Sequence, residues 1–330
     1  MKKMVSSWLT LGLLFAVHTL GAQAQTFTFF DPAGSTGTYS SAIDSKGRVV
    51  GFFFDSSGTH GFLRQANGTV TKLNATRMAS TFPVGITPTG IIAGDYAGTA
   101  GFHGFVRDAK GHYTYFQVLP AADTQVRSMN VLGQLTGTYT DSAAVFHGFW
   151  RNTDGTIVKF DYPGAAGTNG QAINQSGQIA GLFTDANGVQ HGFLRRPDGT
   201  FAKFDPKGST QTIPIAINDA GQIAGFYSDA ASVRHGFLRK ANGSIVLINV
   251  PGSSYTAPAA INNNGVIVGS YRTGGIEQHG FVRHADGTFA TFDPSGSTQT
   301  LPFAINDTGT IAGAENAPGA IYHGFLTPAP

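Results

Sequence analysis

Short runs of β-branched and aromatic residues alternate with Gly- and Asn-rich turns along most of the chain. In the segment after Thr212 these runs occupy residues 213–218, 222–227, 235–239 and 244–249. The intervening turns Asn218–Gly221 and Lys240–Gly243 both suit a type I turn closed by a glycine in the left-handed region. The pattern predicts four antiparallel strands, named A, B, C and D in chain order.

The same four-strand unit recurs about every 44 residues. The tripeptide His-Gly-Phe, at the start of strand C, begins at His60, His103, His147, His191, His235, His279 and His323. Four antiparallel strands with this period are typical of a β-propeller blade. The sequence therefore predicts an all-β fold, a single seven-bladed β-propeller over residues 25–330.

The two ends of the chain predict how the ring closes. Residues 25–35 match a strand D, as a comparison with residues 200–209 shows, and the chain ends on a strand C. We expect the N-terminal strand to complete the last blade, which removes two exposed sheet edges.

The first 24 residues have the features of a secretory signal peptide. Lys2 and Lys3 precede an apolar run at 8–20, and small residues follow at 22–24. We expect cleavage after Ala24 and a periplasmic or secreted protein. No later run approaches the roughly 18 to 20 apolar residues that span a bilayer.

Charge and cysteine content exclude several classes of partner. Without Lys2 and Lys3, the 21 basic residues fall to 19, which equals the 19 acidic residues. Nucleic acids and anionic membranes select a basic surplus, so neither is expected as a partner. With no cysteine, disulfides and thiolate chemistry are excluded. We expect a monomer without cofactor or metal.

Residues that recur in every unit are interpreted first as scaffold. One glycine per unit, as at Gly221, should supply the positive φ of the turn between strands A and B. A second, as at Gly225, should allow close approach of neighbouring sheets. A threonine at the start of strand A should bond the preceding loop. The arginines that end strand C are expected to be solvated or ion-paired: Arg64, Arg107, Arg151, Arg195, Arg239 and Arg283.

The seven histidines of strand C do not predict a shared metal ion. Neighbouring copies should lie roughly 15 Å apart, whereas zinc needs ligands at about 2 Å. We expect each histidine to bond a neighbouring loop or blade. A metal held by one histidine and loop carboxylates is the alternative.

The repeat resembles the HAF-type extracellular repeat of bacterial secreted proteins. The strings at 216–225 (AINDAGQIAG) and 191–205 (HGFLRRPDGTFAKFD) carry the resemblance, which covers nearly all of the mature chain, with Gly in place of the central Ala. It implies an exported, propeller-like protein and brings no activity, substrate or catalytic residues.

Functional residues should lie where the symmetry breaks. The loops at 73–81 and 116–123 depart from the other blade entries, which draws attention to blades two and three. The candidate site residues are of two kinds. Charged exceptions to the repeat are Arg127 within a strand A, Arg77 in a D-to-A loop, Glu277 and Glu315 in or near B-to-C loops, and Asp44 where later blades carry Asn.

Aromatic candidates are the second kind. Tyr39, Tyr162 and Tyr255 offer faces on which sugars stack, whereas Trp150, inside a strand C, is expected in the core. Drift in surface loops is the alternative reading of each single exception.

No motif of common hydrolases or nucleotide-binding enzymes occurs in the sequence. The leading hypothesis is an exported, non-catalytic binding or interaction propeller that takes a glycan or a protein at its loop face. The first alternative is a hydrolase or lyase with one site at the channel mouth, built on Arg127, Glu277 and Glu315 with Arg77. The second is a structural component of the envelope or matrix.

Overall fold

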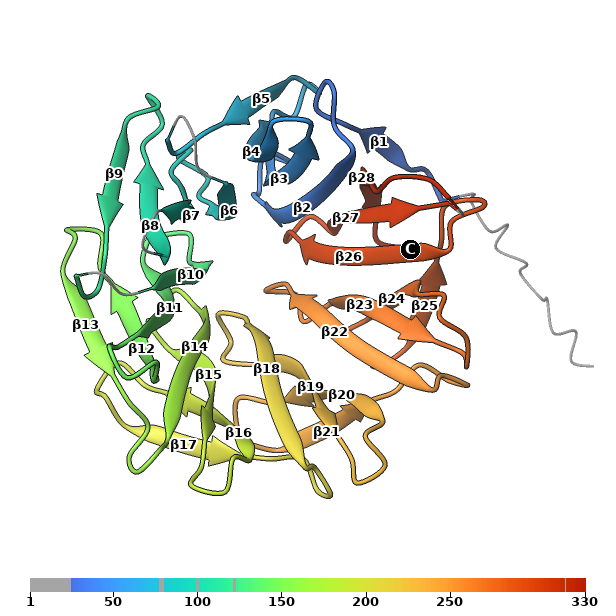
Figure 1. Ribbon diagram of the computed structural model, residues 1–330. Coiled ribbons are helices and arrows are strands. Elements are labelled where there is room, and N and C mark those ends of the chain that lie inside the picture. The colour runs from blue at the N-terminus through green and yellow to red at the C-terminus, as the bar shows by residue number, and fades with distance from the viewer. Residues whose placement is uncertain (1–24, 77–79, 99–100, 121–122, 318) are drawn as a thin grey trace, which may run out of the picture.

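A computed structural model of the chain describes residues 25–76, 80–98, 101–120, 123–317 and 319–330. These residues form 28 strands in seven four-stranded antiparallel sheets, arranged as blades around a central axis (Figure 1). The predicted seven-bladed propeller is confirmed. Two predictions, the signal peptide at 1–24 and the ligand-binding role of Arg77, fall outside the described residues.

Blades 1 to 7 follow the chain, and in each the innermost strand comes first (Figure 1). The strands of blades 1 to 3 are β2 (Gly37–Ile43), β3 (Val49–Asp55), β4 (Gly58–Arg64), β5 (Val70–Leu73), β6 (Thr81–Ile86), β7 (Ile92–Gly98), β8 (Gly101–Arg107), β9 (Tyr113–Phe116), β10 (Thr124–Met129), β11 (Leu135–Thr140), β12 (Phe146–Arg151) and β13 (Ile157–Phe160).

The strands of blades 4 to 7 are β14 (Gly167–Ile173), β15 (Ile179–Thr184), β16 (Gln190–Arg195), β17 (Phe201–Phe204), β18 (Gln211–Ile217), β19 (Ile223–Ser228), β20 (Arg234–Arg239), β21 (Ile245–Ile248), β22 (Tyr255–Ile261), β23 (Ile267–Arg272), β24 (His279–Arg283), β25 (Phe289–Phe292), β26 (Gln299–Ile305), β27 (Thr310–Asn316), β28 (His323–Pro328) and, from the N-terminal end, β1 (Thr28–Phe30).

Blade 7 combines both ends of the described chain. Strand β1 pairs antiparallel with β28, with Thr28 opposite Leu326 and Phe30 opposite Gly324. The predicted closure of the ring is therefore confirmed, and it ties the two ends together by backbone hydrogen bonds.

The hydrophobic core lies between adjacent blades, at interfaces that we call seams. The seam between blades 4 and 5 shows the arrangement, because Leu194 and Phe204 of blade 4 pack with Ile223 and Phe237 of blade 5. The phenylalanine of each His-Gly-Phe is at most 1% exposed: Phe62, Phe105, Phe149, Phe193, Phe237, Phe281 and Phe325. Burial of such a ring contributes about 1.5–3 kcal/mol, so the tripeptide holds neighbouring blades together.

Each unit has one glycine within strand B, such as Gly225, and one within strand C, such as Gly236. Different neighbours prevent a side chain at each of the two. A Cβ at Gly225 would lie 2.3 Å from the Ile213 carbonyl oxygen and 2.8 Å from the Phe237 ring, both in its own blade. The predicted sheet-to-sheet approach is therefore wrong at this position. It occurs instead at Gly236, where a Cβ would lie 2.9 Å from Pro258 of the next blade.

Five of the six arginines that end strand C are buried, and the expectation of solvated or paired charges is wrong for them; Arg107 is half-buried. Arg195 is 8% exposed, and its guanidinium lies 5.0 Å from the ring centre of Phe160 in the preceding blade. Its Nη1 donates to the Arg196 carbonyl at 3.3 Å. Burial lowers the pKa of Arg195. A cation–π contact stabilises the fold more when it is shielded from water. The same stacking on a phenylalanine of the preceding blade joins blades at Arg64, Arg151 and Arg239.

The other recurring positions act as predicted. Gly221 closes its turn with φ 76°, and its N–H donates to the Asn218 carbonyl at 2.9 Å. The Thr168 hydroxyl accepts from the Tyr162 N–H in the loop that leads into its strand, at 3.0 Å. Nowhere in the described residues is there a helix with the length and apolar character needed to cross a membrane.

Candidate functional site

Each innermost strand has a β-bulge at the same position, and this bulge directs one side chain toward the central channel. In β10 the register shifts between Val126 and Ser128, so Arg127 has no partner in β11. A bulge re-aims a side chain in this way. The bulged residues are Ser41, Val84, Arg127, Gln171, Ile215, Ala259 and Phe303. Arg127 is the charged member of this ring, and all but Ala259 line a channel cavity of about 340 Å³.

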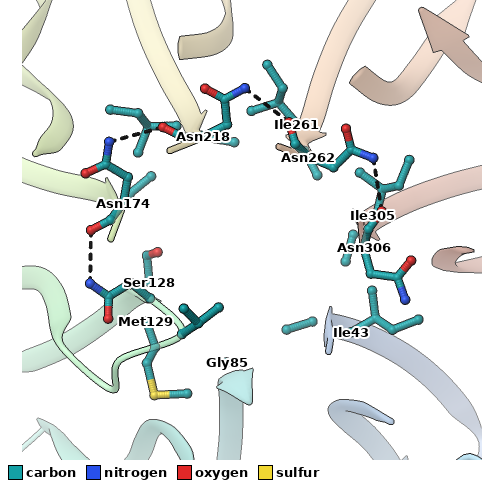
Figure 2. A pocket seen from close by; sticks show the side chains of 18 of the residues that line it. Ile43, Gly85, Ser128, Met129, Asn174, Asn218, Ile261, Asn262, Ile305 and Asn306 are labelled. Carbon is teal, nitrogen blue, oxygen red and sulfur yellow. Dashed lines mark hydrogen bonds between the residues drawn. The ribbon is translucent and has the colours of Figure 1, made fainter. Parts of the chain in front are cut away.

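An arc of asparagines joins the blades at one end of this cavity (Figure 2). Each side-chain amide donates to the backbone carbonyl of the asparagine in the next blade, at 2.9–3.1 Å, as from Asn174 to Asn218. The donors are Asn130, Asn174, Asn218 and Asn262, and Asn306 continues the arc to the Asp44 carbonyl at 3.0 Å. These buried bonds give the asparagines a scaffold role.

Asp44 belongs to the same scaffold. Its carboxylate, which has no amide to donate, accepts from Arg48 Nε at 2.7 Å. Arg48 Nη2 then donates to the carbonyls of Thr87 and Pro88 in blade 2, at 2.9 and 3.1 Å. The Asp44–Arg48 pair therefore replaces the missing asparagine donor between blades 1 and 2.

Six of the seven strand C histidines bond loops of their own blade: His60, His147, His191, His235, His279 and His323. His147 Nδ1 lies 2.9 Å from Asp161 Oδ1, after strand D, and its Nε2 lies 3.3 Å from Asp141 Oδ2 in the B-to-C loop. His191 repeats this arrangement with Asp205 and Asp185. The predicted loop-bonding role is thus observed in these blades. Within the described ranges, no three His, Asp or Glu side chains are arranged to hold a metal ion.

A second cavity, which we call the seam pocket, opens between blades 2 and 3. Its volume is about 300 Å³, and it shares Val84 and Arg127 with the channel cavity. Its full lining is Phe82, Val84, Asp95, Phe102, Gln125, Val126 and Arg127. Ligand pockets start at about this volume, and their usual composition is apolar walls with a few polar groups.

The Asp95 carboxyl is the unusual group of this pocket. Asp95 lies in β7 opposite Phe82 and is 8% exposed. Burial raises its pKa to about 7, while the Arg127 charge and the Val126 backbone N–H act in the opposite direction. Asp95 and Arg127, both described residues, form no direct ion pair; Arg127 Nη2 instead donates to Gln125 Oε1 at 2.6 Å. Near neutral pH the pocket therefore holds a carboxyl that donates or accepts a proton.

Six aromatic rings lead away from the seam pocket and form what we call the aromatic strip: Phe102, Phe82, Phe52, Phe54, Tyr39 and Tyr322. Successive ring centres lie 5.0–6.0 Å apart. Phe54 is 39% exposed and the other five are half-buried. The strip crosses blades 2, 1 and 7, and Phe82 and Phe102 belong also to the pocket wall.

Two of the predicted site residues belong to the seam pocket or the aromatic strip, and the others lie elsewhere. Arg127 lines the seam pocket, and Tyr39 belongs to the aromatic strip. Tyr255 lies at the seam of blades 5 and 6. Arg234 stacks on its ring, and Arg234 Nη1 donates to its hydroxyl at 2.8 Å. Glu277 is exposed in the loop between β23 and β24.

Glu315 is buried in β27, opposite His323. Burial raises its pKa, and the nearby Asp31 charge adds to this while His323 opposes it. Neither Glu315 nor Glu277 lines the seam pocket or the channel cavity. The aromatic candidates left over pack as scaffold: Tyr162 stacks on Phe183 at 3.7 Å and Trp150 lies against the same core cluster.

Asp95 is absent from the residues predicted for the site, although the repeat contains a signal for it. It follows the strand B glycine, where the seven units carry Phe52, Asp95, Thr138, Leu182, Phe226, Ser270 and Ala314. Asp95 is the one charged residue in this column. Comparison of the middle strands, in addition to the inner strands and loops, would have identified it.

Comparisons with known proteins place the chain among propellers. No protein-family model matches the sequence, and none of the curated proteins does. Among solved structures, the β-propeller domain of the Trilobed protease from Pyrococcus furiosus is similar with a TM-score of 0.66 at 12% identity, over 88% of this chain and 95% of that chain. That domain has an open velcro topology, whereas β1 closes the ring here.

Two further structures show the same fold. The acylaminoacyl peptidase of Pyrococcus horikoshii has a TM-score of 0.62 at 14% identity, over 89% of this chain and 52% of that chain. This chain thus spans about half the length of the peptidase. The BP39L lectin of Burkholderia pseudomallei has a TM-score of 0.56 at 9% identity, over 90% of this chain and 99% of that chain. At these identities the likeness extends to the fold alone.

Proposed function

We propose that this protein is a binding protein and that its ligand, a glycan, enters the seam pocket between blades 2 and 3. The observation that carries the proposal is the combination of two phenylalanine walls, the buried Asp95 carboxyl and the Arg127 guanidinium around one cavity of about 300 Å³. Aromatic faces pack against the apolar face of a sugar ring, and the polar groups orient its hydroxyls.

Binding is favoured over hydrolysis because the pocket has a single carboxyl. Most glycoside hydrolases need two carboxyl groups that flank the scissile bond. Among the described residues that line the seam pocket, Asp95 is the one acidic residue. The likeness of the fold to the BP39L lectin is compatible with a propeller that binds glycans.

A thermal-shift screen of residues 25–330 against mono- and oligosaccharides tests this proposal. A ligand that prefers the folded state raises the melting temperature. We expect such a rise for the wild type and for Gln171→Ala, which alters the equivalent bulge position in blade 4, and a smaller rise for Arg127→Ala. Equal rises in Arg127→Ala and the wild type would place the ligand elsewhere, and no rise with any saccharide would contradict glycan binding.

A hydrolase or lyase is the second candidate, and the pKa of Asp95 favours it. A carboxyl with a pKa of about 7 is suited to general acid or base catalysis at neutral pH. Incubation of each saccharide that binds, followed by product analysis, distinguishes the two functions. New products that Asp95→Asn fails to form would indicate an enzyme, and an unchanged saccharide would indicate a binding protein.

We also propose that the chain is an exported member of the HAF-type repeat proteins, with residues 1–24 removed on export. The supporting observations are the sequence of that segment and the repeat strings at 191–205 and 216–225. N-terminal sequencing of the protein from culture medium and periplasm tests both cleavage after Ala24 and location.

A further inference from the structure

The aromatic strip and the seam pocket form one continuous surface. Phe82 belongs to both, and the ring centres of Phe82 and Phe52 lie 5.4 Å apart across the seam of blades 1 and 2. Tyr39 and Tyr322 continue the strip across the next seam at 5.0 Å. A series of partly exposed rings beside a pocket offers stacking faces for successive units of a chain.

The strip occupies only one side of the propeller. At the positions of Tyr39 and Phe52, blade 4 carries Asn169 and Leu182, and blade 6 carries Ala257 and Ser270. The pocket therefore has stacking faces on its blade 1 side. This asymmetry gives a bound chain one direction, with its terminal unit in the pocket.

The charges around the pocket favour an anionic terminal unit. Asp95 is packed against β6, β8 and β10, and the residues of β6 and β8 that line the pocket carry no charge. Strand β10 contributes Arg127, and Asp123, just before it, accepts the Phe102 N–H at 2.7 Å. With Asp95 protonated, Arg127 is the charged group among the described pocket residues, and a guanidinium pairs well with a carboxylate.

We infer that the ligand is an acidic oligosaccharide whose terminal uronic acid enters the seam pocket with its carboxylate at Arg127, while the following units lie on the aromatic strip. This inference rests on the proposed function and specifies its ligand class. The neutral Asp95 carboxyl donates a hydrogen bond to the same terminal unit. Binding of this anion therefore weakens as Asp95 ionises.

Isothermal titration with galacturonic acid and its dimer, trimer and tetramer tests the inference, alongside the same series with the carboxyls reduced to alcohols. We expect affinity to rise at least tenfold from the monomer to the trimer and to be at least tenfold higher for the acidic trimer than for the reduced one. Arg127→Ala should abolish the preference for the acidic series. Phe52→Leu should reduce the gain with chain length, whereas Phe226→Leu, the equivalent change in blade 5, should not.

The pH dependence gives a second readout. For the wild type, affinity for the acidic trimer should fall by up to tenfold per pH unit above about pH 7. Asp95→Asn should remove this fall. Equal affinity for both series, or no gain with chain length, would overturn the inference while leaving glycan binding in place; failure of every saccharide to bind would overturn the proposed function itself.

Discussion

The seam between blades 2 and 3 and the seam between blades 5 and 6 are built from equivalent positions with different contents. Where the first has Asp95 and Phe102, the second has Phe226 and Arg234. The Arg234 guanidinium lies 4.1 Å from the Phe226 ring centre and donates to the Tyr255 hydroxyl at 2.8 Å, so this side chain fills the seam. At the first seam the buried Asp95 carboxyl and the exposed Arg127 lie around a cavity of about 300 Å³.

The two seams differ in the polar group that they contain at these positions, a carboxyl in the first and a guanidinium in the second. A guanidinium is planar and weakly hydrated, and it stacks on aromatic rings while its N–H groups bond outward. A buried carboxylate has no comparable attraction to a ring face, and burial instead favours its neutral form. The same scaffold therefore yields a closed seam in one place and a polar pocket in another. Four substitutions test this comparison, in order of decreasing expected effect.

Asp95→Asn should produce the largest change in stability. The pKa of Asp95 is raised from 3.8 to about 7, so the folded state binds its proton more tightly than the unfolded state. The contribution of Asp95 to wild-type stability should thus be most favourable below about pH 4, fall between about pH 4 and 7, and level off above. At pH 8 we expect the variant to be more stable by up to about 4 kcal/mol, and at pH 4 to match the wild type, as measured by urea unfolding.

Asp229→Asn in blade 5 is a control for which the opposite pH dependence of stability is expected. Its pKa is lowered, chiefly by His235, so the charged form stabilises the fold and the variant should lose stability at pH 8. Identical pH profiles for Asp95→Asn and the wild type would contradict the assignment of a buried neutral carboxyl.

Arg234→Ala should destabilise the closed seam by about 2 kcal/mol, because it removes two cation–π contacts and a hydrogen bond. Denaturant unfolding at pH 7 measures the loss. Arg234→Lys, which keeps the charge without the planar stacking group, should lose less. A variant as stable as the wild type would mean that the guanidinium does not hold this seam together.

Arg127→Ala should change stability by less than about 0.5 kcal/mol, because the side chain is exposed. It should raise the pKa of Asp95 further, since the Arg127 charge favours the ionised carboxyl. Carboxyl carbon NMR over a pH series measures this, with Gln171→Ala as the matched variant that leaves the pKa unchanged. An unchanged Asp95 pKa in Arg127→Ala would show that the two groups do not interact across the pocket.

Gln211→Ala should have the smallest effect, a loss of at most a few tenths of a kcal/mol, at the seam of blades 4 and 5. It removes a neutral, partly exposed hydrogen bond from Gln211 Nε2 to Gln190 Oε1 at 2.5 Å. Urea unfolding of Gln211→Ala and Arg234→Ala compares how much each inter-blade contact contributes to the free energy of unfolding. A larger loss than for Arg234→Ala would contradict the view that charge sets the strength of a seam.

Two residues of the candidate site could be predicted from the sequence. Arg127 stands out as a charge within an inner strand, and Tyr39 stands out as an aromatic exception. Asp95 was not predicted, although its charge is an exception among the residues that follow the strand B glycine. The contact of Phe82 with Phe52 could not be predicted, because it depends on which side chain of one blade meets which of the next. Arg195 was predicted to be solvated or ion-paired for this second reason: its partner, Phe160, lies in the preceding blade.

The sequence by itself determined the number of blades, the strand order, the turns and the closure by the N-terminal strand. These features follow from strand periodicity and turn chemistry, which are local and recur in every unit. Only the tertiary structure decided that the seam of blades 5 and 6 closes and that the seam of blades 2 and 3 holds a pocket. A seam is formed by two blades together, so the burial of Asp95 and the exposure of Arg127 depend on contacts that no single repeat contains.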